Sequence, residues 1–205
     1  MTKLRSQREL AQTLLNKQKI MRLIELRKTG VTAATINRMA RAGEVIRLSR
    51  GVYQLPDTDL DPNHSLAAAA KRVPKGVVCL VSALAFHGLT DQLPPKAWMA
   101  IGPKDWAPRH SGAGIRIVRF TYPLLREGIE MHMIDGVSVK VFSAAKTVAD
   151  CFRHRSKVSL SIAIEGLQET LKQRKATPAE IARQADKGGV STIIRPYLEA
   201  LITHA

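Results

Sequence analysis

Apolar residues near the start of the chain recur at helical spacing. They predict one helix around Leu10 and Leu14 and a second around Leu23 and Leu26, with a break near residues 17–19. Thr29-Gly30 ends the second helix, because glycine after a helical stripe favours termination. A third, short helix is predicted from Thr32, with Ile36, Met39 and Ala40 on the face that packs against the preceding helix.

The middle of the chain changes to short strand-like runs. A helix over 63–72 comes first, and a helix over 82–87 interrupts the strands that follow. The predicted strands are 77–81, 97–101, 115–120, 129–134 and 137–142. Asp135-Gly136 separates the last two and is the strongest short hairpin signal in the sequence.

From residue 143 onward the apolar spacing is helical again. Stripes over 145–152 and 160–171 predict two helices, and Thr177-Pro178 begins a third. Residues 193–202 form the last predicted helix. The C-terminal part is therefore expected to be helical.

Prolines and aspartates over 56–63 interrupt the pattern and mark a domain boundary. The expected domains are 1–56, a linker and connecting helix over 57–76, and 77–205. The fold class is α+β. An N-terminal winged helix-turn-helix precedes a mixed α/β domain with short antiparallel strands and a helical C-terminal part.

Charge changes this picture by indicating a polyanionic partner. The 205 residues carry a net charge of +15, and residues 1–55 hold 12 of the 32 Lys and Arg but only 3 of the 17 Asp and Glu.

Cys79 and Cys151 lie far apart in apolar stretches, which argues against a disulfide framework. The longest apolar run, 77–86, is too short to cross a bilayer, so we expect a soluble cytoplasmic protein without a membrane partner.

The charged residues of the third helix and of the following hairpin, 44–55, predict a double-stranded DNA interface. On the helix, the face opposite the apolar stripe is suited to the major groove, while basic residues of the hairpin, or wing, suit phosphates. Val45, with Leu48 or Ile46, is expected to anchor the wing, and Gly51 allows the chain to return. The alternative is a solvated basic face on a small helical domain. The predicted DNA-binding residues are Thr32, Ala34, Thr35, Asn37, Arg38, Arg41, Arg47, Ser49 and Arg50.

Five sequence blocks in one order carry a family resemblance. They are Arg50-Gly-Val-Tyr-Gln-Leu-Pro56, Ser82-Ala-Leu-Ala-Phe-His-Gly-Leu-Thr-Asp-Gln92, Ile134-Asp-Gly-Val137, Ala145-Lys-Thr-Val-Ala-Asp-Cys-Phe152 and Arg195-Pro-Tyr-Leu-Glu-Ala-Leu201. Together these blocks resemble the AbiEi family of antitoxins over nearly the whole chain.

The resemblance implies an antitoxin and transcriptional autorepressor of a type IV toxin–antitoxin pair in phage defence. The winged helix would bind repeats in the protein's own promoter, and the C-terminal domain would supply antitoxin action. The functional partner would be an AbiEii-like nucleotidyltransferase toxin, and a stable complex with it is not required. Two alternatives stay open: a plain transcriptional regulator, and a nucleic-acid-processing enzyme.

Residues with catalytic potential are expected to be structural, so no catalytic, cofactor or metal site is predicted. His87 is expected at a helix end, and His110, His132 and His154 lack metal-ligand spacing. Lys146 and Asp150, one helical turn apart, predict a surface or half-buried ion pair. Trp98 is expected in the core, whereas Trp106 is either buried or part of a contact surface. Two basic clusters either extend a binding surface or are solvated helix rims: Arg153, Arg155 and Lys157, and Lys172, Arg174 and Lys175.

Overall fold

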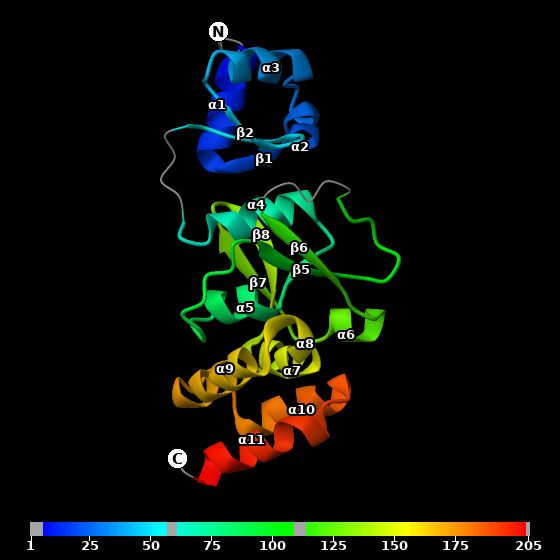
Figure 1. The fold of residues 1–205 in the computed structure, drawn as a ribbon. Coiled ribbons are helices and arrows are strands. Elements are labelled where there is room, and N and C mark those ends of the chain that lie inside the picture. The colour runs from blue at the N-terminus through cyan, green and yellow to red at the C-terminus, as the bar shows by residue number, and fades with distance from the viewer. Residues whose placement is uncertain (1–5, 57–60, 109–113, 204–205) are drawn as a thin grey trace. The chain divides into compact units, whose positions relative to one another are not determined.

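The computed structural model describes residues 6–56, 61–108 and 114–203, and His110 lies outside them. The chain divides into two compact units (Figure 1). The first comprises residues 1–74 with 132–139, and the second comprises 75–131 with 140–205. The predicted linker falls partly in the undescribed residues 57–60, and its helix groups with the first unit.

Among its described residues, the first unit contains four helices and a small antiparallel sheet of order β1-β3-β2. Its core gathers the apolar stripes that the sequence shows, including Leu15, Leu26, Ile36, Met39 and Tyr53. The elements are α1 (Gln7–Lys17), β1 (Ile20–Arg22), α2 (Leu23–Lys28), α3 (Ala33–Arg41), β2 (Ile46–Ser49) and β3 (Val52–Gln54), followed by α4 (His64–Arg72). The three-residue strand β1 was not predicted, because so short a run carries no period of its own.

Polar contacts within the first unit hold α4 and the hairpin residues 132–139 to their neighbours. Lys71 of α4 donates to both carboxylate oxygens of Glu25 in α2, each at 2.8 Å. The Asp135 carboxylate lies 2.7 Å from His64 Nδ1 and accepts from the Asp61 backbone N–H. Asp135 is therefore a structural residue at a turn.

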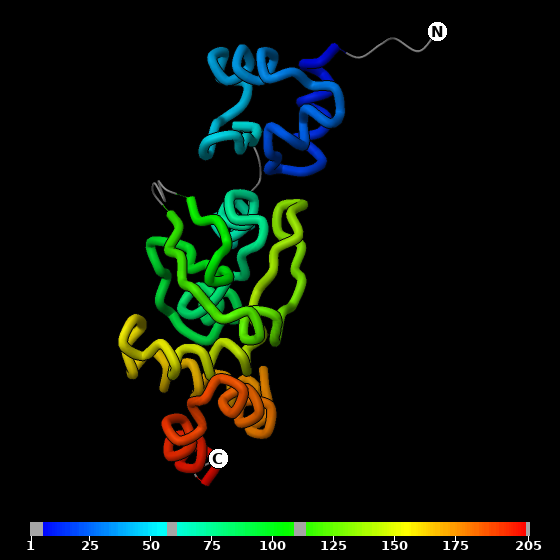
Figure 2. Tube along the Cα trace, turned by 90° about the vertical axis from the view of Figure 1, so that its right-hand side faces the viewer, coloured from blue at the N-terminus to red at the C-terminus, as the bar shows by residue number. Residues whose placement is uncertain are grey.

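The second unit is built on a mixed sheet with helices at one end, and only the hairpin residues 132–139 of this sheet group with the first unit (Figures 1 and 2). The strand order is β6-β5-β4-β8-β7, in which β5 pairs with β6 and β4 with β8 in parallel. The strands are β4 (Val77–Val78), β5 (Ala97–Ile101), β6 (Ile115–Arg119), β7 (Ile129–Ile134) and β8 (Val137–Phe142). The predicted hairpin is confirmed: Asp135 and Gly136, both at positive φ, join β7 to β8.

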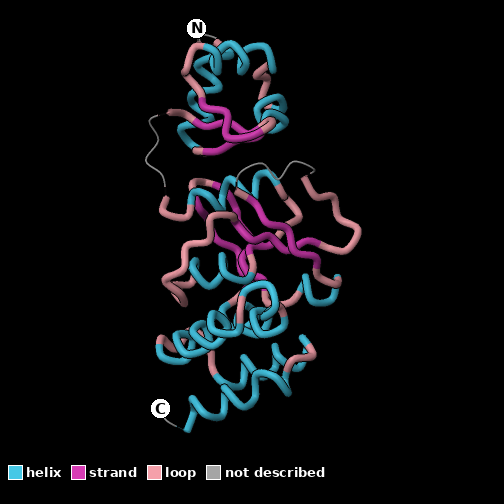
Figure 3. The backbone as a smooth tube through the Cα atoms, viewed as in Figure 1, coloured by secondary structure: helices cyan, strands magenta, loops and turns pink. Residues whose placement is uncertain are grey.

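Helices make up the rest of the second unit, and the C-terminal part is helical as predicted (Figure 3). They are α5 (Leu80–Phe86), α6 (Tyr122–Arg126), α7 (Ala144–Arg153), α8 (Arg155–Val158), α9 (Leu160–Lys172), α10 (Pro178–Gly188) and α11 (Ser191–Thr203). The predicted strand over 77–81 is wrong beyond Val78, since helix α5 already begins at Leu80. That run is buried on all sides, so its apolar character does not distinguish a strand from a helix. Short helices α6 and α8 were not predicted.

Helix α7 lies at the centre of this unit. It packs against α5, α9 and α10, and every residue from Ala144 to Phe152 is buried. The Ser143 side chain caps its first turn by accepting from the Lys146 N–H. Over residues 144–152 this helix has no solvated face, so Lys146 and Asp150 lie inside the core, whereas Arg153 at its end is half-buried.

Candidate nucleic-acid interface

The core of the first unit fixes the orientation of α3. Ile36 and Met39 are buried, and the half-buried Ala40 packs against the same core. The predicted apolar face of this helix is therefore confirmed. Because side chains on the opposite face of a helix point away from its buried stripe, α3 presents the remaining residues to solvent.

A polar network between α1 and α3 positions the N-terminus of α3. Thr32 caps the helix, its hydroxyl accepting from the Thr35 N–H at 3.3 Å. Gln7 Oε1 of α1 accepts from the Thr35 hydroxyl at 2.7 Å and from the Thr32 hydroxyl at 3.0 Å. These bonds hold the first turn of α3 in one orientation.

The exposed face of α3 carries four predicted DNA-binding residues. Ala34, Asn37, Arg38 and Arg41 are all exposed, as is the capping Thr32. Neither arginine forms an ion pair with any residue that the structure describes. Two uncompensated guanidinium groups on one helix face are suited to base edges and phosphates, which offer acceptors.

The hairpin of β2 and β3 forms the wing next in the chain. Val45 is buried and anchors its base, and Leu48 is half-buried whereas Ile46 is 42% exposed. The strands turn at Gly51, whose φ of 74° is in the left-handed region. Arg47 and Arg50 are exposed and form no ion pair within the described chain. The wing thus carries cations near its tip.

Two predicted contact residues are not presented to solvent. Thr35 is 6% exposed, and its hydroxyl is engaged by Thr32 and Gln7. The Ser49 hydroxyl is also buried and has no partner among the described residues. Thr35 lies on the flank of α3 that faces α1, which the helical period alone could not show. These two positions differ from the expectation of direct contact, and the other seven predicted residues are exposed.

Sequence reasoning missed the residues that support α3 from α1. Besides Gln7, Arg8 forms an ion pair with Glu44, which follows α3, at 2.6 Å. The sequence does carry a local signal for the start of α1, because Ser6 and Glu9 form a capping box there. The partners of Gln7 and Arg8 depend on tertiary packing and have no local signature.

In the second unit, the buried ion pair Lys146–Asp150 corrects a prediction. The ammonium donates to Asp150 Oδ1 at 2.6 Å, and both side chains are 1% exposed, so the predicted surface or half-buried pair is fully buried. Burial raises the pKa of Asp150 to about 6, against the lowering effect of Lys146. Such a pair organises the core rather than a surface site.

Two of the histidines, His87 and His154, have structural surroundings. His87 ends α5, and its Nε2 lies 2.7 Å from the Phe142 carbonyl oxygen. Burial, reinforced by nearby cations, lowers the pKa of His154 to about 4, so this ring is neutral at pH 7. Among the described residues, no three His, Cys, Asp or Glu side chains are grouped to hold a metal ion.

The two tryptophans differ in exposure. Trp98 in β5 is buried, as expected, whereas Trp106 is 68% exposed.

The basic cluster of Arg153, Arg155 and Lys157 does not share one environment. The half-buried Arg153 donates to the Gly188 carbonyl, whereas the exposed Lys157 lines a cavity. No helix in the described ranges is long and apolar enough to cross a membrane.

Element order and surface chemistry define the class of the first unit. Helix, strand, two helices and two strands follow in succession, with a cationic helix face and hairpin, which is an arrangement typical of a winged helix-turn-helix. Residues 8–56 match the family described as "Transcriptional regulator, AbiEi antitoxin". Within residues 8–56 this match supports the AbiEi resemblance and a transcriptional regulator of the toxin–antitoxin class, with DNA as the expected partner.

A solved structure shares the fold over most of the chain. The crystal structure of the RV2827C protein from Mycobacterium tuberculosis superposes with a TM-score of 0.59 at 13% identity, covering 94% of this chain and 79% of that chain. The likeness in fold extends beyond residues 8–56 to most of the chain. No curated protein matches the sequence.

Proposed function

We propose that this protein is a type IV antitoxin that represses its own promoter and counteracts an AbiEii-like nucleotidyltransferase toxin in phage defence. One observation carries the DNA-binding part: Arg38 and Arg41 of α3 and Arg47 and Arg50 of the wing are all exposed and have no ion-pair partner in the described chain. The family match supports the antitoxin part.

In this mechanism the protein acts by binding and not by catalysis. Helix α3 lies in the major groove, where Arg38 pairs with guanine and Asn37 with adenine, and Ala34 contacts a thymine methyl. Arg47 and Arg50 hold the phosphate backbone, which fixes position without reading sequence. The second unit supplies the antitoxin action, in the cytoplasm where promoter and toxin are both present.

The phosphate contacts predict a marked dependence of DNA affinity on salt. If roughly four to six phosphates are neutralised, a plot of log affinity against log salt has a slope of about −4 to −5. Fluorescence anisotropy on a promoter duplex at several salt concentrations measures this slope. A slope near zero would contradict binding by the exposed arginines.

Antitoxin action is tested by co-expression with the adjacent reading frame. From an unrelated promoter, both the full chain and its Arg38→Ala variant are expected to restore growth of cells that express the toxin. Repression of the natural promoter is expected only from the unaltered chain, since Arg38 serves DNA reading alone. If the full chain fails to restore growth, the antitoxin proposal is wrong and the protein is a plain transcriptional regulator.

A further inference from the structure

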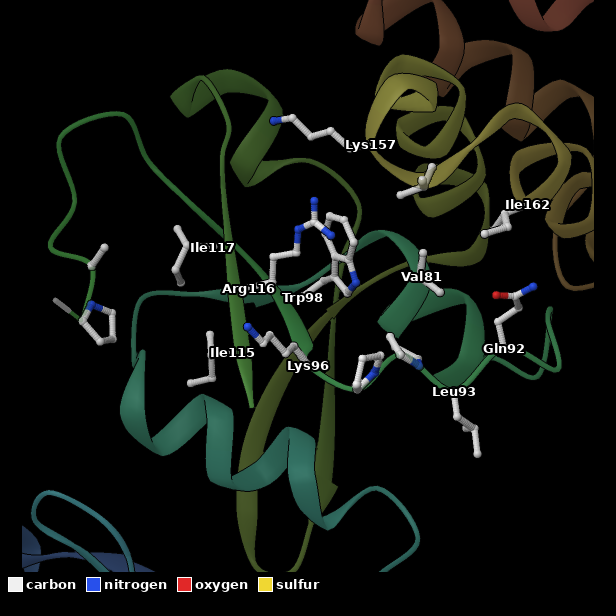
Figure 4. Close-up of a pocket in the computed structure, with 15 residues that line it drawn as sticks. Val81, Gln92, Leu93, Lys96, Trp98, Ile115, Arg116, Ile117, Lys157 and Ile162 are labelled. Atoms are coloured by element: carbon white, nitrogen blue, oxygen red, sulfur yellow. The ribbon is translucent and has the colours of Figure 1, made fainter. Parts of the chain in front are cut away.

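A cavity of about 740 Å³ lies in the second unit, remote in sequence from the winged helix-turn-helix (Figure 4). Its walls come from α5, the segment before β5, strands β5 and β6, and helices α8 and α9. This volume falls in the range of small-molecule sites, which are commonly about 300–1,000 Å³. The candidate DNA-binding residues of α3 and the wing are not among those that line this cavity.

Among the residues that the structure describes, three cations from three separate segments line the cavity, and no carboxylate does. Lys96 precedes β5, Arg116 belongs to β6, and Lys157 belongs to α8. None of the three forms an ion pair with a residue of the described ranges. Gathering like charges at one concave surface is unfavourable without a counter-charge, so the cavity is complementary to an anion.

The guanidinium of Arg116 is held in place by an aromatic ring. It stacks on Trp98 with 3.9 Å between Cζ and the ring centroid, and Figure 4 shows the two side by side. Trp98 is 5% exposed, and its backbone N–H donates to the buried Ser82 hydroxyl at 2.9 Å. Because a rigid ring covers one face of the guanidinium, its N–H edge is available for a bidentate bond to phosphate.

Apolar side chains complete the cavity. Val81 and Ile162 line it together with the consecutive prolines 94 and 95, whereas the side chains of Ile115 and Ile117 alternate with Arg116 along β6 and point to the other side of this strand (Figure 4). A ligand that satisfies both surfaces has an anionic end for the cations and a flat, weakly polar body for the isoleucine and proline walls. A nucleoside phosphate has both parts, whereas an extended acidic peptide offers carboxylates but no flat body for these walls.

We propose that this cavity binds a nucleoside phosphate, with Arg116, Lys96 and Lys157 on the phosphate and the apolar wall against the base. The same chemistry is offered by a free nucleotide and by the phosphorylated end of a nucleic-acid strand. Arg116 is the principal recognition residue because its orientation is set before the ligand binds. This site adds a ligand to the protein and does not depend on promoter binding.

Calorimetric titration of the full chain tests the proposal with four probes: nucleoside triphosphates, a 5′-phosphorylated single-stranded trinucleotide, inorganic phosphate and a short poly-glutamate peptide. Arg116→Gln is expected to weaken nucleotide binding about 10- to 100-fold, the loss expected when a hydrogen bond to a charged group is removed. The matched control is Arg126→Gln in α6, which removes the same charge from an exposed position outside the cavity. Thermal unfolding confirms that both variants are folded.

Each outcome supports or overturns the proposal. Binding of triphosphates alone supports a free nucleotide, and preference for the trinucleotide supports a strand end. Equal loss in Arg116→Gln and Arg126→Gln, phosphate binding as tight as nucleotide binding, preference for poly-glutamate, or no binding of any probe would overturn it. Promoter binding is expected to be unchanged in Arg116→Gln, so failure here is distinguishable from failure of the DNA-binding proposal.

Discussion

Replacing Arg38 with alanine is expected to weaken binding to the promoter by about 1–3 kcal/mol, or about 5- to 150-fold. Arg38 lies on the exposed face of α3, whose orientation is fixed by the buried Ile36 and Met39. A bidentate bond to guanine would be lost, while the helix itself would keep its packing. A mobility-shift titration on the upstream region measures the effect, with Arg126→Ala as the charge-matched control.

A comparison with Arg50→Ala separates base reading from phosphate contact. Arg50 lies at the wing tip, so its removal should weaken binding uniformly across DNA sequences and reduce the salt slope by about 1. Arg38→Ala should instead relax specificity at one base pair. Equal affinity of Arg38→Ala and the unaltered protein would remove Arg38 from the interface.

Replacing Lys146 with methionine is expected to destabilise the protein by about 3–5 kcal/mol, because a buried charge would lose its partner. The side chains of Lys146 and Asp150 are both 1% exposed. The ring centroids of Phe120 and Phe142 lie 5.5 and 5.1 Å from Lys146 Nζ. Asp150 Oδ2 already has no partner in the described chain. Urea unfolding followed by circular dichroism measures the free energy of unfolding.

The double variant Lys146→Met with Asp150→Leu is expected to recover most of this stability, since no unpaired charge stays buried. As a control, Arg195→Ala breaks the exposed pair with Glu199 on α11 and should leave unfolding unchanged. A single Lys146→Met variant as stable as the unaltered protein would show that the pair does not hold the core.

Much of the fold was predicted correctly where the spacing of apolar residues and the residues at turns and caps indicate the same element. The hairpin around Asp135-Gly136 has the predicted strand bounds, and Thr177 caps α10 as its capping pattern indicates. The strand predicted over 77–81 is wrong beyond Val78. Residues of this run are buried on all sides, so they show no alternation of apolar and polar positions. Lys146 and Asp150 were expected nearer the surface because their spacing shows that they pair but not what surrounds them.

The candidate DNA interface could be predicted because it depends on one helix face and one hairpin. Exposure of Arg38 and Arg50 follows from local period and turn position, whereas the withdrawal of Thr35 depends on Gln7, 28 residues earlier. The cavity around Arg116 had no sequence signal, because its walls come from separate segments that only folding brings together.

The most direct test measures binding of the purified full chain to its own upstream DNA at low ionic strength, against a shuffled duplex of the same composition. We expect tighter binding to the natural sequence, with affinity for both duplexes falling as salt rises. Equal affinity for the two duplexes, or no binding to either, would contradict the central claim that α3 and the wing read promoter DNA.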